Sequence, residues 1–213
     1  MSRAAFTLPG LLKFTAERLP EEPGDGTPGA CIGTVRVVLD VVRHFGFVVH
    51  EVPVECVAVN RVYRQMVDEN EGEIPADLDV LMEWKERGAH KIVVDPTEAD
   101  DEHGWNGHLV IYADPKPGWH TGMMVDVSSD QFTRREKGMD VPGFVVAEAP
   151  PVFRAGKMQL RVDLDDGTVI IYKASPDNTR YLDYSDWKRK HRTGPIVGPI
   201  IRAAEEKLKG HKG

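Results

Sequence analysis

A long apolar helix near the N-terminus constrains this chain more than any other segment. The run CIGTVRVVLDVVRHF has Thr27 as its expected N-cap and Pro28 at the first helical position, and it stops at Gly46. On a period of 3.6 residues its polar side chains share one narrow stripe, and aliphatic side chains cover the rest. The helix is therefore expected to be mostly buried, with Cys31 inside the apolar arc of its first turn.

The remainder of the chain alternates between helix and strand patterns. Further helices are expected over 10–19, 61–70 and 76–87, with one or two more near the C-terminus. Apolar runs rich in valine, and an Asp-Gly turn between two such runs, indicate strands and a hairpin. The expected strands are FVVHEVPVECVAVN, interrupted at Pro53, then HKIVVD, HLVIYA, GMMVDVS and GFVVAE, and the hairpin is MQLRVDLDDGTVIIYKA.

Together these patterns predict an α+β fold, with a helical N-terminal half whose buried, cysteine-bearing helix packs on an antiparallel sheet. A chain of 213 residues is long enough for one well-buried core. Residues 1–150 are expected to form that core. Residues 151–213 are expected to add a β-hairpin and a C-terminal helix that pack on the same core.

The net charge and the two cysteines limit which partners and which cellular location we expect. With 34 acidic and 27 basic side chains the net charge is −7, which argues against nucleic acid as the main partner. The N-terminal stretch lacks the continuous apolar core of a signal peptide, and no segment approaches the roughly 20 apolar residues of a membrane helix. A cytoplasmic location is expected, with Cys31 and Cys56 as free thiols and Cys56 in the core.

Cys31 occupies a position that suits a nucleophile. A thiol reacts as the thiolate, and a helix N-terminus favours the negative form. The nucleophile also needs a base, and the base needs a third group that orients it. His108 begins one expected strand and Asp126 ends the next, so antiparallel pairing would bring them together, with Asp130 as a competitor for the orienting role. Each residue alone also fits a purely structural role.

The order of these residues resembles a known superfamily. A cysteine in the first turn of a buried helix, then WNGHLVIY and MMVDVSSDQF, is similar to the transglutaminase-like branch of the papain-like enzymes, over residues 27–135. Arylamine N-acetyltransferases share the same order of Cys, His and Asp. The resemblance implies that Cys31 is the nucleophile, His108 the general base and acid, and Asp126 the residue that holds the imidazole.

Such chemistry needs donors for the oxyanion. The backbone N–H of Cys31 is the first candidate, and Trp105, Asn106 and Gln131 are candidates for the second.

The sequence therefore predicts a cysteine-dependent amide or acyl hydrolase of the peptidase or deamidase type, without a cofactor, acting on a peptide, protein or small acyl substrate. The second interpretation is an enzyme that transfers the acyl group to an amine. The third interpretation is a catalytically silent binding protein of the same fold. A metal-dependent hydrolase built on His103, His108, His120 and the acidic run 98–102 is the fourth. Oligomeric state remains open.

Overall fold

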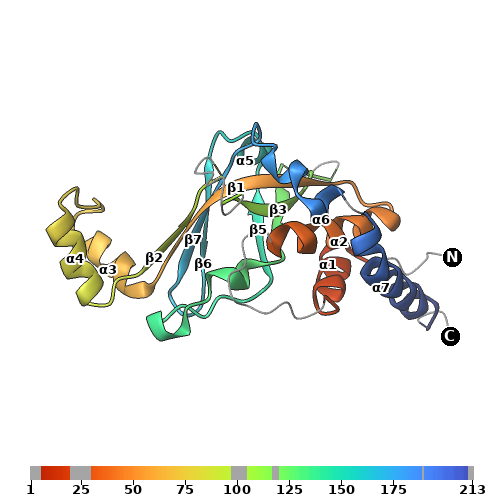
Figure 1. The fold of residues 1–213 in the computed structure, drawn as a ribbon, viewed down its shortest axis with the longest axis horizontal. Coiled ribbons are helices and arrows are strands. Elements are labelled where there is room, and N and C mark those ends of the chain that lie inside the picture. Colours follow the sequence, from red (N-terminus) through yellow and green to blue (C-terminus); the bar gives the residue numbers. More distant parts are fainter. Residues whose placement is uncertain (1–5, 20–29, 97–104, 117–119, 189, 211–213) are drawn as a thin grey trace.

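The computed structural model describes residues 6–19, 30–96, 105–116, 120–188 and 190–210. Its strands are all paired antiparallel in one seven-stranded sheet with the order β5-β4-β3-β1-β7-β6, and β2 lies beside β1. The sheet curves until it is nearly closed into a barrel (Figure 1). The strands are β1 Val49–Val59, β2 Lys91–Val94, β3 His108–Ala113, β4 Gly122–Asp126, β5 Val145–Ala149, β6 Gln159–Asp163 and β7 Val169–Ala174.

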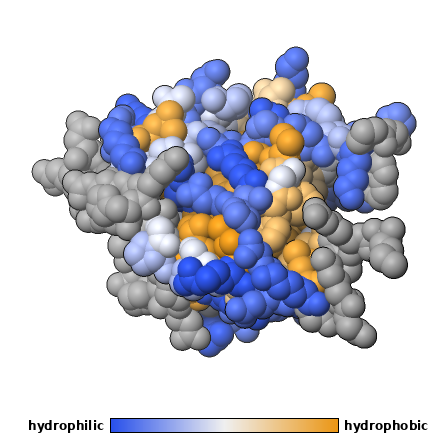
Figure 2. Space-filling view, turned by 90° about the vertical axis from the view of Figure 1, so that its right-hand side faces the viewer, coloured by the Kyte–Doolittle hydropathy of each residue, from blue (hydrophilic) through white to orange (hydrophobic). Residues whose placement is uncertain are grey.

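Helices lie at two opposite ends of this sheet (Figure 1). At one end α1, α2 and α7 pack together, and at the other end α3 and α4 form a hairpin. Figure 2 looks onto the end that carries α7, where hydrophobic side chains show between hydrophilic ones. The helices are α1 Leu8–Ala16, α2 Ala30–His44, α3 Arg61–Glu69, α4 Leu78–Glu86, α5 Pro151–Arg154, α6 Ser185–Lys188 and α7 Lys190–Gly210.

The predicted α+β class is confirmed, but one strand boundary was wrong. Pro53 does not interrupt β1, because it sits opposite Leu109 of β3 just where the ladder with β7 ends. Its carbonyl oxygen accepts a hydrogen bond of 2.8 Å from Ser175 N, on the β7 side. The amide N–H that proline lacks would point to the same side, beyond the last paired residue, so no β1–β3 hydrogen bond is lost.

Strand β3 is buried on both faces of the sheet. Along β3, Leu109 and Ile111 belong to the core under α1, α2 and α7, whereas Val110 and Tyr112 belong to the core inside the curved sheet. Successive side chains of a strand point to opposite faces, so every residue of β3 is buried. β3 is thus the strand on which the two cores meet.

The segment after residue 150 contributes to the same sheet as the segment before it. β7 pairs with β1 in the middle of the sheet, and α7 packs on α2. A division of the chain at residue 150 stays a prediction. Among the described residues, no helix combines the length and apolar character needed to cross a membrane.

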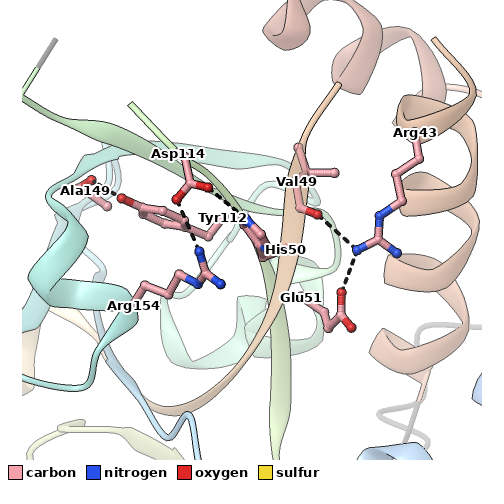
Figure 3. Close-up of polar contacts among 8 residues, drawn as sticks. All are labelled: Arg43, Val49, His50, Glu51, Tyr112, Asp114, Ala149 and Arg154. Carbon is pink, nitrogen blue, oxygen red and sulfur yellow. Dashed lines mark hydrogen bonds and ion pairs between the residues drawn. The ribbon is translucent and has the colours of Figure 1, made fainter. Parts of the chain in front are cut away.

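Polar contacts fix α2 and β3 against β1 (Figure 3). Arg43 of α2 donates to a carboxylate oxygen of Glu51 at 2.8 Å. His50 of β1 lies 2.8 Å from Asp114, whose other oxygen accepts from Arg154 at 3.2 Å. Exposed ion pairs contribute little stability each, so these contacts mainly select one arrangement of the elements.

Asn60 attaches the α3–α4 hairpin to the sheet. Its side-chain oxygen accepts hydrogen bonds from Tyr63 N at 2.9 Å and from His90 N at 3.0 Å. Its amide nitrogen donates to Gly88 O and to Lys137 O, both at 2.8 Å. The side chain is buried, so one asparagine caps α3 and joins both ends of the hairpin to a neighbouring loop.

Asn60→Ala should destabilise the protein by roughly 2–3 kcal/mol, because the change removes a helix cap and leaves buried backbone groups without partners. Urea denaturation measures the loss. The matched control is Asn70→Ala, which removes an exposed hydrogen bond of 2.8 Å to Glu73 O and should cost much less. Equal losses in the two variants would show that the buried hydrogen bonds of Asn60 contribute no more to stability than one exposed hydrogen bond.

Candidate active site

Cys31 is the second residue of α2 within the described part of the chain, and 2% of its surface is exposed. The prediction that Cys31 occupies the first turn of a buried helix is confirmed, while Thr27 and Pro28 fall outside the described residues. The Sγ atom is 4.0 Å from the carbonyl oxygen of Gly107, the residue that precedes β3. Backbone N–H groups of a first helical turn lack intrahelical acceptors, and they favour a negative group beside them.

His108 and Asp126 form a fully buried pair. Nε2 of His108 donates to Oδ2 of Asp126 at 2.8 Å, and neither side chain is exposed to solvent. In the β3–β4 register Ile111 is opposite Val125, so His108 and Asp126 are diagonal neighbours on one face of the sheet. The hairpin inferred from the sequence therefore brings these two residues together.

Asp126 has further donors around its carboxylate. Tyr172 of β7 donates its hydroxyl to Oδ2 at 3.0 Å, and the backbone N–H of Ser128 donates to Oδ1 at 3.0 Å. Burial, together with the charge of Asp126, raises the pKa of Tyr172 well above its usual value, so its hydroxyl keeps its proton. Both carboxylate oxygens are thus satisfied, as a buried charge requires.

The surroundings of His108 favour its charged form. Burial alone lowers the pKa of the imidazole, but the charge and hydrogen bond of Asp126 outweigh burial, and a hydrogen bond and charge from Cys31 add to them. The net effect raises the pKa of His108 to about 10. The raised pKa favours the protonated ring, while Cys31 Sγ contacts the carbonyl oxygen of Gly107, the residue next to His108 in the chain.

The three candidate oxyanion donors differ in their placement. The side-chain nitrogen of Gln131 contacts Nδ1 of His108 and lies 3.4 Å from Nε2, the ring nitrogen that is bonded to Asp126. Trp105 is buried, and its indole N–H donates to Asn178 at 3.2 Å while its backbone N–H donates to the hydroxyl of Tyr184. Asn106 is exposed. Only Gln131 touches the histidine.

Gly107 and Tyr172 belong to the site and were missed in the sequence. A Cβ atom on Gly107 would lie 2.1 Å from the Trp105 ring and 2.8 Å from Pro96, so a side chain here would displace the strand that carries His108. The sequence does place this glycine directly before His108 and two residues after Trp105, in the segment WNGH. Tyr172 comes from the C-terminal hairpin, and no local pattern connects it to Asp126.

The competing residues lie elsewhere. Asp130 is exposed and lines a separate cavity of about 540 Å³ with Thr133, Arg135 and Asp140. His120 is exposed, and His103 and the acidic run 98–102 fall outside the described residues. Within the described part of the chain no group of three potential ligands could hold a metal.

The second thiol belongs to the core. Cys56 is fully buried, and burial with the nearby charges of Asp126 and Cys31 raises its pKa well above the usual value. Both cysteines are free, as predicted. Cys56 is therefore held as an inert thiol close to the candidate site.

Comparison of the chain with family models, with curated proteins and with solved structures found no match. Only the geometry of the site bears on what the protein does.

The proton on His108 should make stability depend on pH. In a Cys31→Ala variant the folded protein keeps a proton that the unfolded chain releases above about pH 6.5. The contribution of the His108–Asp126 pair is fully present below that pH and is lost as the pH rises through the raised pKa of the ring, which Asp126 still sets in this variant. Between about pH 6.5 and 8 the free energy of unfolding should fall with a slope approaching 1.4 kcal/mol per pH unit.

Urea denaturation at stepped pH measures this slope, and adding His108→Gln should abolish it. A flat profile in the Cys31→Ala variant would contradict a charged His108.

Proposed function

We propose that this protein is a cysteine-dependent amide or acyl hydrolase of the papain-like or transglutaminase-like kind, which works through a thioester on Cys31. One observation carries the proposal: the buried His108 ring has the Asp126 carboxylate on one nitrogen, and Cys31 Sγ lies 4.0 Å from the carbonyl oxygen of Gly107, the residue before His108. A thiol, an imidazole and a carboxylate in that order make up the constellation of nucleophilic catalysis.

Acylation follows from the charge state of the site. The Cys31 thiolate attacks the carbonyl carbon of an amide, and the electrons of the C=O bond move to the oxygen. When the tetrahedral intermediate collapses, the C–N bond breaks and the leaving nitrogen takes a proton from Nδ1 of His108, because Nε2 is held by Asp126. The products are a free amine, a thioester on Cys31 and a neutral imidazole.

Deacylation reverses the role of His108. The neutral ring takes a proton from water, whose oxygen attacks the thioester carbonyl. The C–S bond breaks, a carboxylic acid leaves, and the thiolate and imidazolium are restored. Asp126 stays ionised throughout and keeps the ring in one orientation, with Tyr172 holding the carboxylate.

Two donors suit the oxyanion of this scheme. The backbone N–H of Cys31 belongs to the first turn of α2, the part of a helix whose N–H groups suit an oxyanion. The side-chain amide of Gln131 lies at the Nδ1 side of His108, where the substrate carbonyl would sit next to the thiolate. The amide nitrogen is the atom beside Nδ1. An imidazolium donates from both nitrogens, so a charged ring requires the amide to be turned with its oxygen toward Nδ1.

Acyl transfer to an amine is the second candidate, and the burial of the site favours it. Cys31 is 2% exposed and His108 and Asp126 are not exposed at all. A thioester kept from water survives until another nucleophile reaches it. The same residues then serve both reactions, with an amine in place of water.

Iodoacetamide should alkylate Cys31 at about pH 6 and leave Cys56 unmodified, because only a thiolate reacts at that pH. Mass spectrometry of peptides locates the label. His108→Gln keeps a donor for Asp126 but cannot hold the proton, and it should slow alkylation at least about tenfold. The same rate in both proteins, or a Cys31 that is inert below about pH 8, would favour a catalytically silent relative.

p-Nitrophenyl acetate should acetylate Cys31 with release of about one equivalent of nitrophenol per protein before steady turnover. Cys31→Ser, a folded control, should give no burst. Added glycine methyl ester then decides between the two reactions. An N-acetylated product at the expense of acetate indicates transfer, and acetate alone indicates hydrolysis. Absence of a burst in the wild-type protein contradicts both.

A further inference from the structure

The α3–α4 hairpin is acidic. Over residues 61–87 it holds eight acidic and four basic side chains, a net charge of −4, and the stretch 68–87 has a net charge of −6 because Arg61 and Arg64 lie before it. All eight acidic side chains are exposed. Arg87 lies within 4 Å of Glu69 and Glu83, and Arg64 lies within 4 Å of Asp68. The acidic residues are Asp68, Glu69, Glu71, Glu73, Asp77, Asp79, Glu83 and Glu86.

The same hairpin exposes a row of large apolar side chains. Leu78 is 74% exposed and Met82 53%, and their spacing of four residues puts them on one face of α4. Ile74, just before the helix, is 53% exposed. Single exposed apolar residues are common, but a row of three on one short segment is typical of an interaction surface.

The described part of the chain does not cover this apolar row. The opposite face of α4 is already buried, because Trp84 packs edge-on against Tyr63 of α3 with ring centroids 5.8 Å apart. Asn60 fixes both ends of the hairpin to the sheet. The hairpin therefore presents Ile74, Leu78 and Met82 outward on a rigid support.

We propose that the outer face of α4 docks a basic amphipathic helix of a partner protein. The α4 face consists of the apolar row Ile74, Leu78 and Met82 with the carboxylates of Asp79, Glu83 and Glu86 beside it. An apolar stripe flanked by Lys and Arg would bury the row and neutralise the carboxylates. The inference goes beyond the proposed chemistry, since this face lies at the opposite end of the sheet from α2 (Figure 1).

Charge favours this occupant over two others. A second copy of the chain would bring its own acidic stretch 68–87, with a net charge of −6, against the first, and like charges across an interface are repelled. Membrane surfaces and nucleic acids are themselves anionic. A cationic amphipathic helix is the partner that meets both the apolar and the acidic parts of the face.

The test uses the full-length, ¹⁵N-labelled protein and a synthetic helical peptide of Leu and Lys, with Leu at helical spacing i, i+3, i+4 and i+7. Amide resonances should shift within residues 71–86 and not around α2. Raising NaCl from about 50 to 500 mM should weaken binding severalfold, because the contact is partly electrostatic. Leu78→Ala with Met82→Ala should weaken it at least about tenfold.

Matched controls separate the apolar and electrostatic parts. Val146→Ala with Val152→Ala removes two other exposed aliphatic side chains and should leave the affinity unchanged. Asp79→Asn, Glu83→Gln and Glu86→Gln together should weaken binding and flatten its salt dependence. A peptide with Ala for every Leu should bind far more weakly.

Three results would overturn the proposal: no shifts within 71–86, equal binding of the Ala-substituted peptide, or a concentration-dependent dimer in sedimentation that Leu78→Ala with Met82→Ala dissolves. The last result would assign the face to a second copy.

Discussion

The buried hydrogen bond between His108 and Asp126 sets the requirements for the rest of the structure. Two ionisable groups with no exposure are stable only when they are paired and their remaining hydrogen-bonding positions are filled. Tyr172 and the Ser128 backbone fill those of the carboxylate. The pair therefore ties β3, β4 and β7 together, and the curved sheet is what allows one carboxylate to receive donors from three separate segments.

Much of this site could be predicted from the sequence, because each part depends on a local pattern. The apolar arc of the helix placed Cys31 toward the interior, and two consecutive strands placed His108 near Asp126. Tyr172 could not be predicted, since β7 reaches Asp126 only through β1 in the strand order. Pro53 led to a wrong strand boundary. A proline weakens a strand only where a neighbouring strand needs its missing N–H, and the sequence does not show which strands will be neighbours.

The α3–α4 hairpin shows a different limit of sequence reasoning. Its two helices were predicted, but the exposure of Leu78 and Met82 was not, because an apolar side chain on a helix is covered only where another element packs on it, as Tyr63 does on Trp84. The net charge of −7 was used as a property of the whole chain, although residues 68–87 account for −6 of it. The position of the charged side chains in the fold says more about possible partners than the net charge of the whole chain does.

The two ends of the molecule are also electrostatically separate. Charges on an exposed hairpin are screened over about 8 Å at physiological ionic strength, whereas Asp126 acts on His108 at 2.8 Å without intervening water. The acidic hairpin therefore contributes little to the charge state of the imidazole, and the proton on His108 is set by Asp126, Cys31 and burial. A partner bound on α4 would affect the buried site through the segments that the hairpin contacts, which include β1, β2 and the loop at Lys137.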